Sequence, residues 1–470
     1  MEDLSLYSIK DEPKNNENED VKEEKKITKE NNKIKIKEEK EENIPFFQNE
    51  KIKGNYEKLQ KIISSKILTN AQKEWLNNFL TEINQTDVSK IKIRDINGVD
   101  KKLELVFDLD NTCILSLITH SNDSIVIKKQ MLLAKKGAQL YKFIFDNKEL
   151  YSILIFRKGL KEFVEYIKPL CNFHISTLGF ETYGQEIKKI LSKYLGINFI
   201  RFKGRKFREC EKNLSDLHLE KDKTIIIDDN LNVWSNNADD RENVILSKFF
   251  YDEECLLYSK IDNSVNENEI NNLNLFLSSY KNLCYSRIIE YDIDWKNQEI
   301  IDSSNVLFYQ FRDNHDFNII NYNQCFTAES LNSKNIQLLY LKNVIKQIYC
   351  LKYLYNIDIP LSIKLIRIST LSNLIFDLKY LNFRQKTVLT DIVKICGGII
   401  FEKDKINIDS ETVYLVASQQ EYALNKEKIK KYISMNPNFI LINEKFILDT
   451  YFCMTNIKMN INDSEYKFHL

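Results

Sequence analysis

Glycine, proline and histidine are scarce in this sequence, and each shortage excludes a class of protein. The 470 residues include 10 glycines and 5 prolines, which excludes collagen-like and proline-rich architectures. Five histidines, and nine cysteines without a single C-x-x-C pair, argue against a zinc site. Because the cysteines are odd in number and scattered, free thiols in a reducing compartment fit better than a disulfide framework.

An excess of charge of one sign and long apolar runs are also missing. Lys and Arg together number 68, as do Asp and Glu, so the formal net charge is zero. That balance argues against a basic, nucleic-acid-coating surface, and we expect no direct nucleic-acid partner. The apolar runs fall well short of the ~18 residues that cross a bilayer, and the N-terminus is acidic and lacks a signal-peptide core. These absences predict an intracellular soluble protein without a membrane partner.

What is present is enough apolar material for several hydrophobic cores. Apolar residues make up 43% of the chain, and at about 100–200 residues per domain there is room for two to four domains. Residues 1–54 differ, because they are mostly Glu, Lys and Asn with few large apolar side chains. We expect a disordered charged tail there. Its Lys clusters would also suit nuclear import, although a plain solvated tail is the simpler interpretation.

Three short apolar runs between residues 55 and 255 each end in polar residues. They are Leu103–Phe107 before Asp108, Phe173–Ile175 before Ser176 and Thr177, and Ile225–Ile227 before Asp228 and Asp229. Continuous apolar runs suit strands that are buried on both faces. A helical pattern from Tyr183 to Tyr194, ended by Gly196, lies between two of them. Strands that alternate with helices predict a parallel α/β sheet, in which ligands bind at the carboxyl ends of the strands.

The rest of the chain predicts two further segments. Residues 256–367 look mainly helical and carry no chemical motif, so we expect them to serve packing. Residues 368–460 form a small unit in the order β-α-β-β-α-β-α. Its expected elements are strands at Leu374–Phe376, Ile399–Phe401, Val413–Ala417 and Phe439–Ile442, a helix through Val388 that ends at Gly397-Gly398, and helices at Glu427–Tyr432 and Glu444–Tyr451.

The sharpest motif is Asp108-Leu109-Asp110-Asn111-Thr112, which directly follows the first predicted strand. Two neighbouring carboxylates repel each other, and a bound Mg²⁺ with hard oxygen ligands and a substrate phosphate would relieve that repulsion. Asp108 would then attack phosphorus to form an aspartyl-phosphate, and Asp110 would act as general acid and base. The Thr112 hydroxyl would fix the loop. A surface turn is the alternative, and the placement after a buried strand argues against it.

The ends of the other two strands fit the same chemistry. Asp228 and Asp229 would complete the Mg²⁺ shell with Asp108 and the carbonyl of Asp110. A hydroxyl at Thr177 would bind a phosphoryl oxygen, although an ordinary turn explains it equally well. Lys212 would neutralise the charge of Asp108 and phosphate, whereas on its own it would be an ordinary surface lysine.

Taken in order, these residues resemble the haloacid-dehalogenase phosphatases, and among them the TFIIF-associating class of RNA polymerase II C-terminal-domain (CTD) phosphatases. LVFDLDNT resembles the nucleophile motif of the family, and FRKGL resembles its R-P-G-L element. HISTLGFETYGQEI and TIIIDDNLNVW resemble its Y-T-x-G-x-x-x-Y-A-x-x-I and I-I-D-D-x-x-x-V-W elements. The departures are Lys158 in place of proline and Leu115 in place of a common histidine, neither of which carries chemistry.

The resemblance implies a fold and a role for each matching residue. The fold would be a haloacid-dehalogenase-like Rossmannoid parallel sheet over residues 55–255. The implied catalytic residues are Asp108 and Asp110, the Mg²⁺ ligands are Asp108, Asp110, Asp228 and Asp229, and the residues that bind or support phosphate are Thr112, Thr177, Lys212, Arg157 and Arg208. The family's further arginine would be Arg208, with Arg205 nearly as good a match.

Residues 368–460 resemble a BRCT domain, which such phosphatases carry after the catalytic domain. Gly397-Gly398 matches its tight turn and VYLVA its T-H-L-V-A element, whereas Phe446 stands where tryptophan is usual. The resemblance as a whole implies a nuclear, Mg²⁺-dependent protein-serine/threonine phosphatase, with the phosphorylated CTD of RNA polymerase II as substrate and TFIIF as a partner. A phosphatase of another phosphoprotein and a non-catalytic phosphopeptide-binding scaffold are the alternatives.

Overall fold

The computed structural model describes residues 50–65, 68–87, 93–94, 98–120, 139–145, 148–206, 211–234, 240–248, 250, 337–402, 411–455 and 466–468. Most of the predicted tail, residues 256–336 of the predicted helical segment, and Arg208 lie outside these ranges. The chain divides into two units, Met1–Glu57 and Lys58–Leu470. Helix α2 (Glu50–Ser64) begins in the first unit, and every other element belongs to the second. No helix within the described ranges is both long and apolar enough to cross a membrane.

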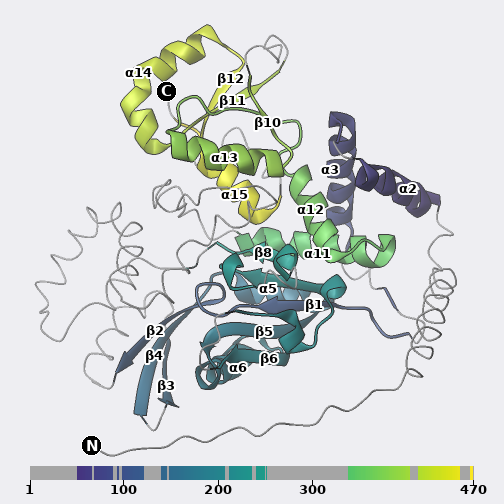
Figure 1. Ribbon diagram of the computed structural model, residues 1–470, viewed down its shortest axis with the longest axis vertical. Coiled ribbons are helices and arrows are strands. Elements are labelled where there is room, and N and C mark those ends of the chain that lie inside the picture. Colours follow the sequence, from purple (N-terminus) through teal and green to yellow (C-terminus); the bar gives the residue numbers. More distant parts are fainter. Residues whose placement is uncertain are drawn as a thin grey trace, which may run out of the picture. The chain divides into compact units, whose positions relative to one another are not determined.

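The centre of the second unit is a five-stranded parallel sheet in the order β6-β5-β1-β7-β8 (Figure 1). Its strands are β6 (Phe199–Arg205), β5 (Cys171–Phe180), β1 (Leu103–Phe107), β7 (Thr224–Asp228) and β8 (Val244–Leu246). The three strands predicted from apolar runs are β5, β1 and β7, which are adjacent, with β1 in the middle. The predicted α/β class with a parallel sheet is therefore confirmed.

The strand register explains why polar residues distant in sequence meet at one edge of this sheet. Phe107 at the end of β1 pairs with Ile175 of β5 and with Ile227 of β7. The next residues along the three strands are Asp108, Ser176 and Asp228. Because all three strands run parallel, these residues lie side by side at the level where β1 ends.

Helices and an apolar cluster bury the two faces of the sheet. On one face, Phe107 packs edge-to-face on Phe163 of α5 (Leu160–Ile167), and α6 (Glu181–Leu195) contacts β5, β6 and α5. Helix α6 ends as predicted at Gly196, whose φ of 64° is left-handed. The other face contributes Val106 and Ile226 to a cluster that includes the buried indole of Trp234.

A three-stranded antiparallel sheet follows the nucleophile motif, and the sequence did not predict it. Its order is β2-β4-β3, with β2 (Ile114–His120), β4 (Lys148–Phe156) and β3 (Gln139–Phe145). Ile114 pairs with Phe156, so Arg157, the residue after β4, returns to the loop that ends at Cys113. The Arg157 N–H donates to the Cys113 carbonyl at 2.9 Å.

Helices connect this domain to the C-terminal unit. They are α11 (Gln337–Tyr355) and α12 (Ile359–Ser369), both of which pack on α3 (Asn70–Gln85). Thus the predicted helical character is present in the described part of 256–367. The N-terminal helix α3, which was assigned to the catalytic domain from the sequence, packs on these helices.

The C-terminal unit has the predicted order of elements around a four-stranded parallel sheet, β10-β9-β11-β12. These elements are β9 (Ile375–Asp377), α13 (Phe383–Ile395), β10 (Ile399–Ile400), β11 (Val413–Ala417), α14 (Gln419–Met435), β12 (Phe439–Asn443) and α15 (Lys445–Cys453). The BRCT assignment of this unit stays a prediction.

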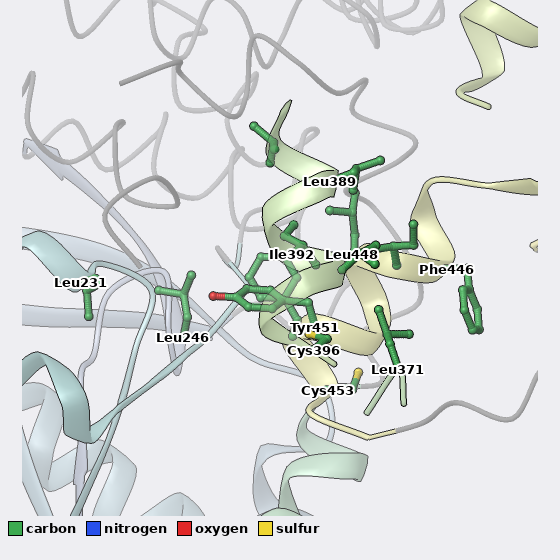
Figure 2. Close-up of a cluster of buried hydrophobic side chains, with 14 of the residues drawn as sticks. Leu231, Leu246, Leu371, Leu389, Ile392, Cys396, Phe446, Leu448, Tyr451 and Cys453 are labelled. Carbon is green, nitrogen blue, oxygen red and sulfur yellow. The ribbon is translucent and has the colours of Figure 1, made fainter. Parts of the chain in front are cut away.

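One apolar cluster joins the C-terminal unit to the catalytic domain (Figure 2). Leu231 and Leu246 come from the catalytic domain, and Tyr451 and Cys453 come from α15. Because burial of apolar surface stabilises a fold by about 25 cal/mol per Å², this shared cluster stabilises both parts.

We expect Gly397→Ala to lower the free energy of unfolding far more than Gly196→Ala does. Both glycines have positive φ, which costs another residue about 1–2 kcal/mol. Only at Gly397 would the new Cβ also meet a backbone atom, the Ile368 carbonyl oxygen, at 1.9 Å. Urea unfolding should therefore show a loss of about 3 kcal/mol or more for Gly397→Ala and only about 1–2 kcal/mol for Gly196→Ala. Equal losses would contradict the close approach.

Candidate active site

Asp108 lies at the carboxyl end of β1 and is paired with a buried lysine. Lys212 Nζ is 2.6 Å from Asp108 Oδ1 and 2.7 Å from Asp228 Oδ2, and all three side chains are at least nine-tenths buried. The backbone N–H of Asp108 donates to the Ile227 carbonyl of the neighbouring strand at 3.0 Å. Burial alone would lower the pKa of Lys212, but the charges of Asp108 and Asp228 outweigh it and raise that pKa. Lys212 is therefore a fixed positive charge between two acids.

Asp228 uses both of its carboxylate oxygens to hold its neighbours. Its Oδ2 accepts the Trp234 indole N–H at 2.8 Å as well as Lys212, and its Oδ1 accepts the backbone N–H of Asn230 at 2.7 Å. The tryptophan of the TIIIDDNLNVW segment thus has a polar task besides its apolar packing. Asp228 orients Lys212 and the turn that carries Asp229.

Asp229 is fastened to the nucleophile loop by two hydrogen bonds. The Thr112 hydroxyl donates to Asp229 Oδ1 at 2.7 Å and accepts the backbone N–H of Asp229 at 3.0 Å. Thr112 therefore joins the loop after β1 to the turn after β7, which is the loop-fixing task expected of its hydroxyl.

Three buried carboxylates meet here, and their charge exceeds that of the single lysine. One oxygen each of Asp108, Asp228 and Asp229 lies within 4.8 Å of the others. Burial, followed by the charges of the neighbouring acids, raises the pKa of Asp108 well above its usual range, and burial together with Asp228 raises the pKa of Asp229 to about 7. A bound hard cation would stabilise the ionised form of these carboxylates and relieve their mutual repulsion. The all-oxygen donor set fits Mg²⁺.

Asp110 stands apart from this cluster and has a different partner. The Tyr183 hydroxyl, from the first turn of α6, donates to Asp110 Oδ1 at 2.7 Å. Burial raises the pKa of Asp110, although this hydrogen bond opposes the rise. A carboxyl with a raised pKa suits a group that delivers a proton near neutral pH. Tyr183 lies in the predicted helical pattern and in the HISTLGFETYGQEI motif, but neither assigned it a role at the site.

Arg157 contacts the loop that carries Thr112. Its Nη1 donates to the Thr112 carbonyl at 3.0 Å and to the Ser247 hydroxyl, and its Nη2 donates to Gln337 Oε1 at 3.0 Å. Burial lowers the pKa of this 2%-exposed arginine to about 10. Arg157 is thus placed as a support of the loop, while Ser247 and Gln337 are partners that the motifs did not indicate.

Thr177 lies near the carboxyl end of β5, the strand beside β1. It is buried, and its hydroxyl accepts the Gly179 N–H at 3.0 Å. Of the two candidate arginines, Arg205 ends β6 with its guanidinium 4.6 Å from the ring centre of Phe180, whereas Arg208 lies outside the described residues. The structure therefore links Asp108, Thr112, Lys212, Asp228 and Asp229 directly. Asp110 is bound to Tyr183, and the phosphate-binding roles of Thr177 and the arginines stay predictions.

The parallel sheet, with acids at the end of its central strand, has the α/β arrangement that the resemblance to haloacid-dehalogenase phosphatases implied. Residues 103–274 match the model of the NLI interacting factor-like phosphatase family, which indicates a phosphatase domain in this part of the chain. The predicted fold class and family resemblance are confirmed.

Solved structures that resemble the chain are distant. Fcp1, described as an essential RNA polymerase II CTD phosphatase, is 16% identical over 76% of this chain and 94% of that one, with a TM-score of 0.43. A fission yeast Fcp1 variant bound to beryllium fluoride is also 16% identical, over 78% and 96%, with a TM-score of 0.44. None of the curated proteins compared with the chain matches it.

We expect Asp229→Asn to stabilise the metal-free protein at pH 8. Asp229 has a pKa of about 7 when folded, against roughly 3.9 for a free aspartate, so the folded state binds the extra proton between these values. Stability should therefore fall as the pH rises from about 4 to about 7, and the full penalty is present above pH 7. The amide removes that penalty and keeps an oxygen for the Thr112 hydroxyl.

Urea unfolding in EDTA at pH 8 and pH 4.5 measures this effect. The variant should exceed the wild type at pH 8, and the difference should shrink at pH 4.5. A variant that is less stable than the wild type at pH 8 would show that the carboxylate is not under electrostatic stress.

Proposed function

We propose that this protein is a Mg²⁺-dependent protein-serine/threonine phosphatase that acts through an aspartyl-phosphate on Asp108. The observation that carries the proposal is the convergence of Asp108, Asp228 and Asp229 on one buried point beside Lys212. Four groups from three separate segments would not be brought together in a protein interior without a charged ligand, because uncompensated buried charge is costly.

Each residue has a task that its position supports. An Asp108 oxygen attacks phosphorus, while Lys212 neutralises charge on the carboxylate and on the phosphoryl group. Asp110, two residues on, gives its proton to the leaving serine or threonine oxygen and then takes a proton from the water that hydrolyses the aspartyl-phosphate. The Tyr183 hydroxyl orients Asp110 for both steps.

Mg²⁺, when bound, supplies positive charge that offsets the phosphate oxygens. Asp108, Asp229 and the carbonyl of Asp110 would hold it, with Asp228 close behind. In this assignment Asp228 acts mainly through Lys212 and Trp234, because both of its oxygens already accept hydrogen bonds.

The proposed substrate is the phosphorylated heptad repeat of RNA polymerase II. Its support is the ordered set of motifs from LVFDLDNT to TIIIDDNLNVW and the C-terminal unit with a BRCT-like order of elements. With that substrate, the proposal includes a nuclear location and TFIIF as a partner.

Asp108→Asn should abolish hydrolysis of an aryl phosphate, because the amide is not a nucleophile. We expect a fall in kcat of at least about 10³-fold, and for Asp110→Asn a fall of about 10²–10⁴-fold. EDTA should remove wild-type activity and Mg²⁺ should restore it. Asp222→Asn, a half-exposed acid paired with Lys352, is the matched control and should keep full activity. Wild-type rates in Asp108→Asn would refute the mechanism.

A serine-phosphorylated heptad peptide should be a better substrate than unrelated phosphopeptides of similar charge, by at least about tenfold in kcat/KM. Specificity of that size needs only about 1.4 kcal/mol of extra transition-state binding. Equal rates would point to another phosphoprotein. Absence of Mg²⁺-dependent hydrolysis on every substrate would favour the non-catalytic scaffold.

A further inference from the structure

The C-terminal unit touches the catalytic domain through polar contacts as well as apolar ones. Lys248, just after β8, forms an ion pair with Asp449 of α15, which is fully buried and also accepts the Tyr466 hydroxyl at 3.0 Å. The apolar cluster of Figure 2 also joins the two parts, with Leu246 from β8 and Tyr451 from α15. An interface that buries an ion pair is a specific one, because the pair is stable only when both partners are in place.

Gln337 lies at the centre of this interface and uses its whole hydrogen-bonding capacity. Its side-chain oxygen accepts Arg157 Nη2 at 3.0 Å and the backbone N–H of Lys248 at 2.8 Å. Its side-chain nitrogen donates to the carbonyls of Leu246 and Phe452, both at 2.9 Å. An amide has two donor hydrogens and two acceptor lone pairs, and all four are used here. Gln337 is 1% exposed, so water cannot replace a lost partner.

These four bonds connect elements that are far apart in the sequence. Phe452 belongs to α15 in the C-terminal unit, Leu246 ends β8 in the central sheet, and Gln337 itself begins α11. Arg157 follows β4 of the antiparallel sheet. The side chain of Gln337 is therefore the point at which the C-terminal unit meets the support of the nucleophile loop.

From Arg157 the contacts continue to the acid cluster without a gap. Arg157 Nη1 donates to the Thr112 carbonyl, and the Thr112 hydroxyl donates to Asp229. A shift of Arg157 would thus move the Thr112 loop, which also carries Asp108 and Asp110. Misplacement of reacting groups by about 1 Å costs as much as 10²-fold in rate.

We infer that Gln337 is a positioning residue through which α15 of the C-terminal unit holds Arg157, and thereby the nucleophile loop, in its working place. This inference rests on the proposed phosphatase function and adds to it that the C-terminal unit is a structural component of the active site. The acceptors that Arg157 finds on Thr112, Ser247 and Gln337 are neutral, so these three contacts are directional hydrogen bonds and not ion pairs.

The test compares two buried glutamines of the same helix. Gln337→Met keeps the length of the side chain and removes all four bonds. The control, Gln347→Met, removes a bond from Gln347 Nε2 to the Leu80 carbonyl at 3.1 Å, on the side that faces α3. We expect kcat on an aryl phosphate to fall by about 10–100-fold in Gln337→Met, with KM changed less than threefold, and to stay within twofold of the wild type in Gln347→Met.

A double-mutant cycle shows whether Gln337 acts through Arg157. In an Arg157→Lys background, which has already lost the fork of donors, the further change Gln337→Met should lower kcat by less than about threefold. Effects that simply multiply would show that Gln337 acts by another route and would overturn the inference.

Amide hydrogen exchange of the full-length protein gives a readout that does not need activity. Exchange at residues 109–114 and at Arg157, whose N–H bonds to the Cys113 carbonyl, should quicken at least tenfold in Gln337→Met and not in Gln347→Met. If the wild type proves inactive, the proposed function fails while this measurement still decides the inference. Unchanged exchange, or unchanged kcat in an active protein, would overturn the positioning role.

Discussion

Lys212, buried between Asp108 and Asp228, is the interaction on which the catalytic end of the sheet depends. One lysine cannot balance three buried carboxylates, so ionising all three of them at this buried point is costly. The parallel sheet imposes this, because its register sends β1 and β7 out at the same level with an acid at the end of each. The packing of the apolar strands thus holds Asp108 and Asp229 in a buried place where their ionised forms are unfavourable, and their pKa values are raised.

That packing extends beyond the catalytic domain. The apolar cluster under β1 and β7 runs through Trp234 and Leu246 into α13 and α15, so a single core stabilises both the acid-bearing strands and the C-terminal unit. Trp234 illustrates how closely core and chemistry are joined. Its ring is fully buried in the cluster, while its indole N–H holds the carboxylate that orients Lys212. A substitution in the core that moves Trp234 would therefore move Asp228 and Lys212, although the substituted residue contacts neither of them.

The elements predicted correctly from the sequence are those whose residue pattern fits only one kind of secondary structure. The strands β1, β5 and β7 are apolar on both faces because helices and the C-terminal unit cover them, and the order of the C-terminal elements follows from short runs separated by clear turns. The edge strand β6 was missed because Arg201 and Lys203 interrupt its apolar residues, which an edge position tolerates. Strands β2 and β3 mix polar and apolar residues, and only their pairing with β4 makes them a sheet.

The site divides in the same way. Asp108, Asp110, Thr112, Asp228 and Asp229 were proposed as site residues because they lie at or just after the ends of strands, and parallel strands bring such residues together. Gln337 carried no comparable signal, and Tyr183 stood in a matched motif without an assigned role at the site. A tyrosine in a first helical turn is usually packing, and a glutamine at the start of a helix says nothing of the arginine 180 positions earlier that it will hold. Their partners are decided by tertiary contacts.

Both ends of the stretch between Phe250 and Gln337 are anchored at the nucleophile loop. The Phe250 N–H donates to the carbonyl of Asn111 at 2.5 Å, and Gln337 meets Arg157 behind the same loop. Since hydrogen bonds at the two anchor points fix where the chain leaves and returns, the length of the intervening sequence does not set the geometry of the catalytic groups. Insertions and deletions between the anchors can therefore accumulate during evolution while the reaction centre is preserved.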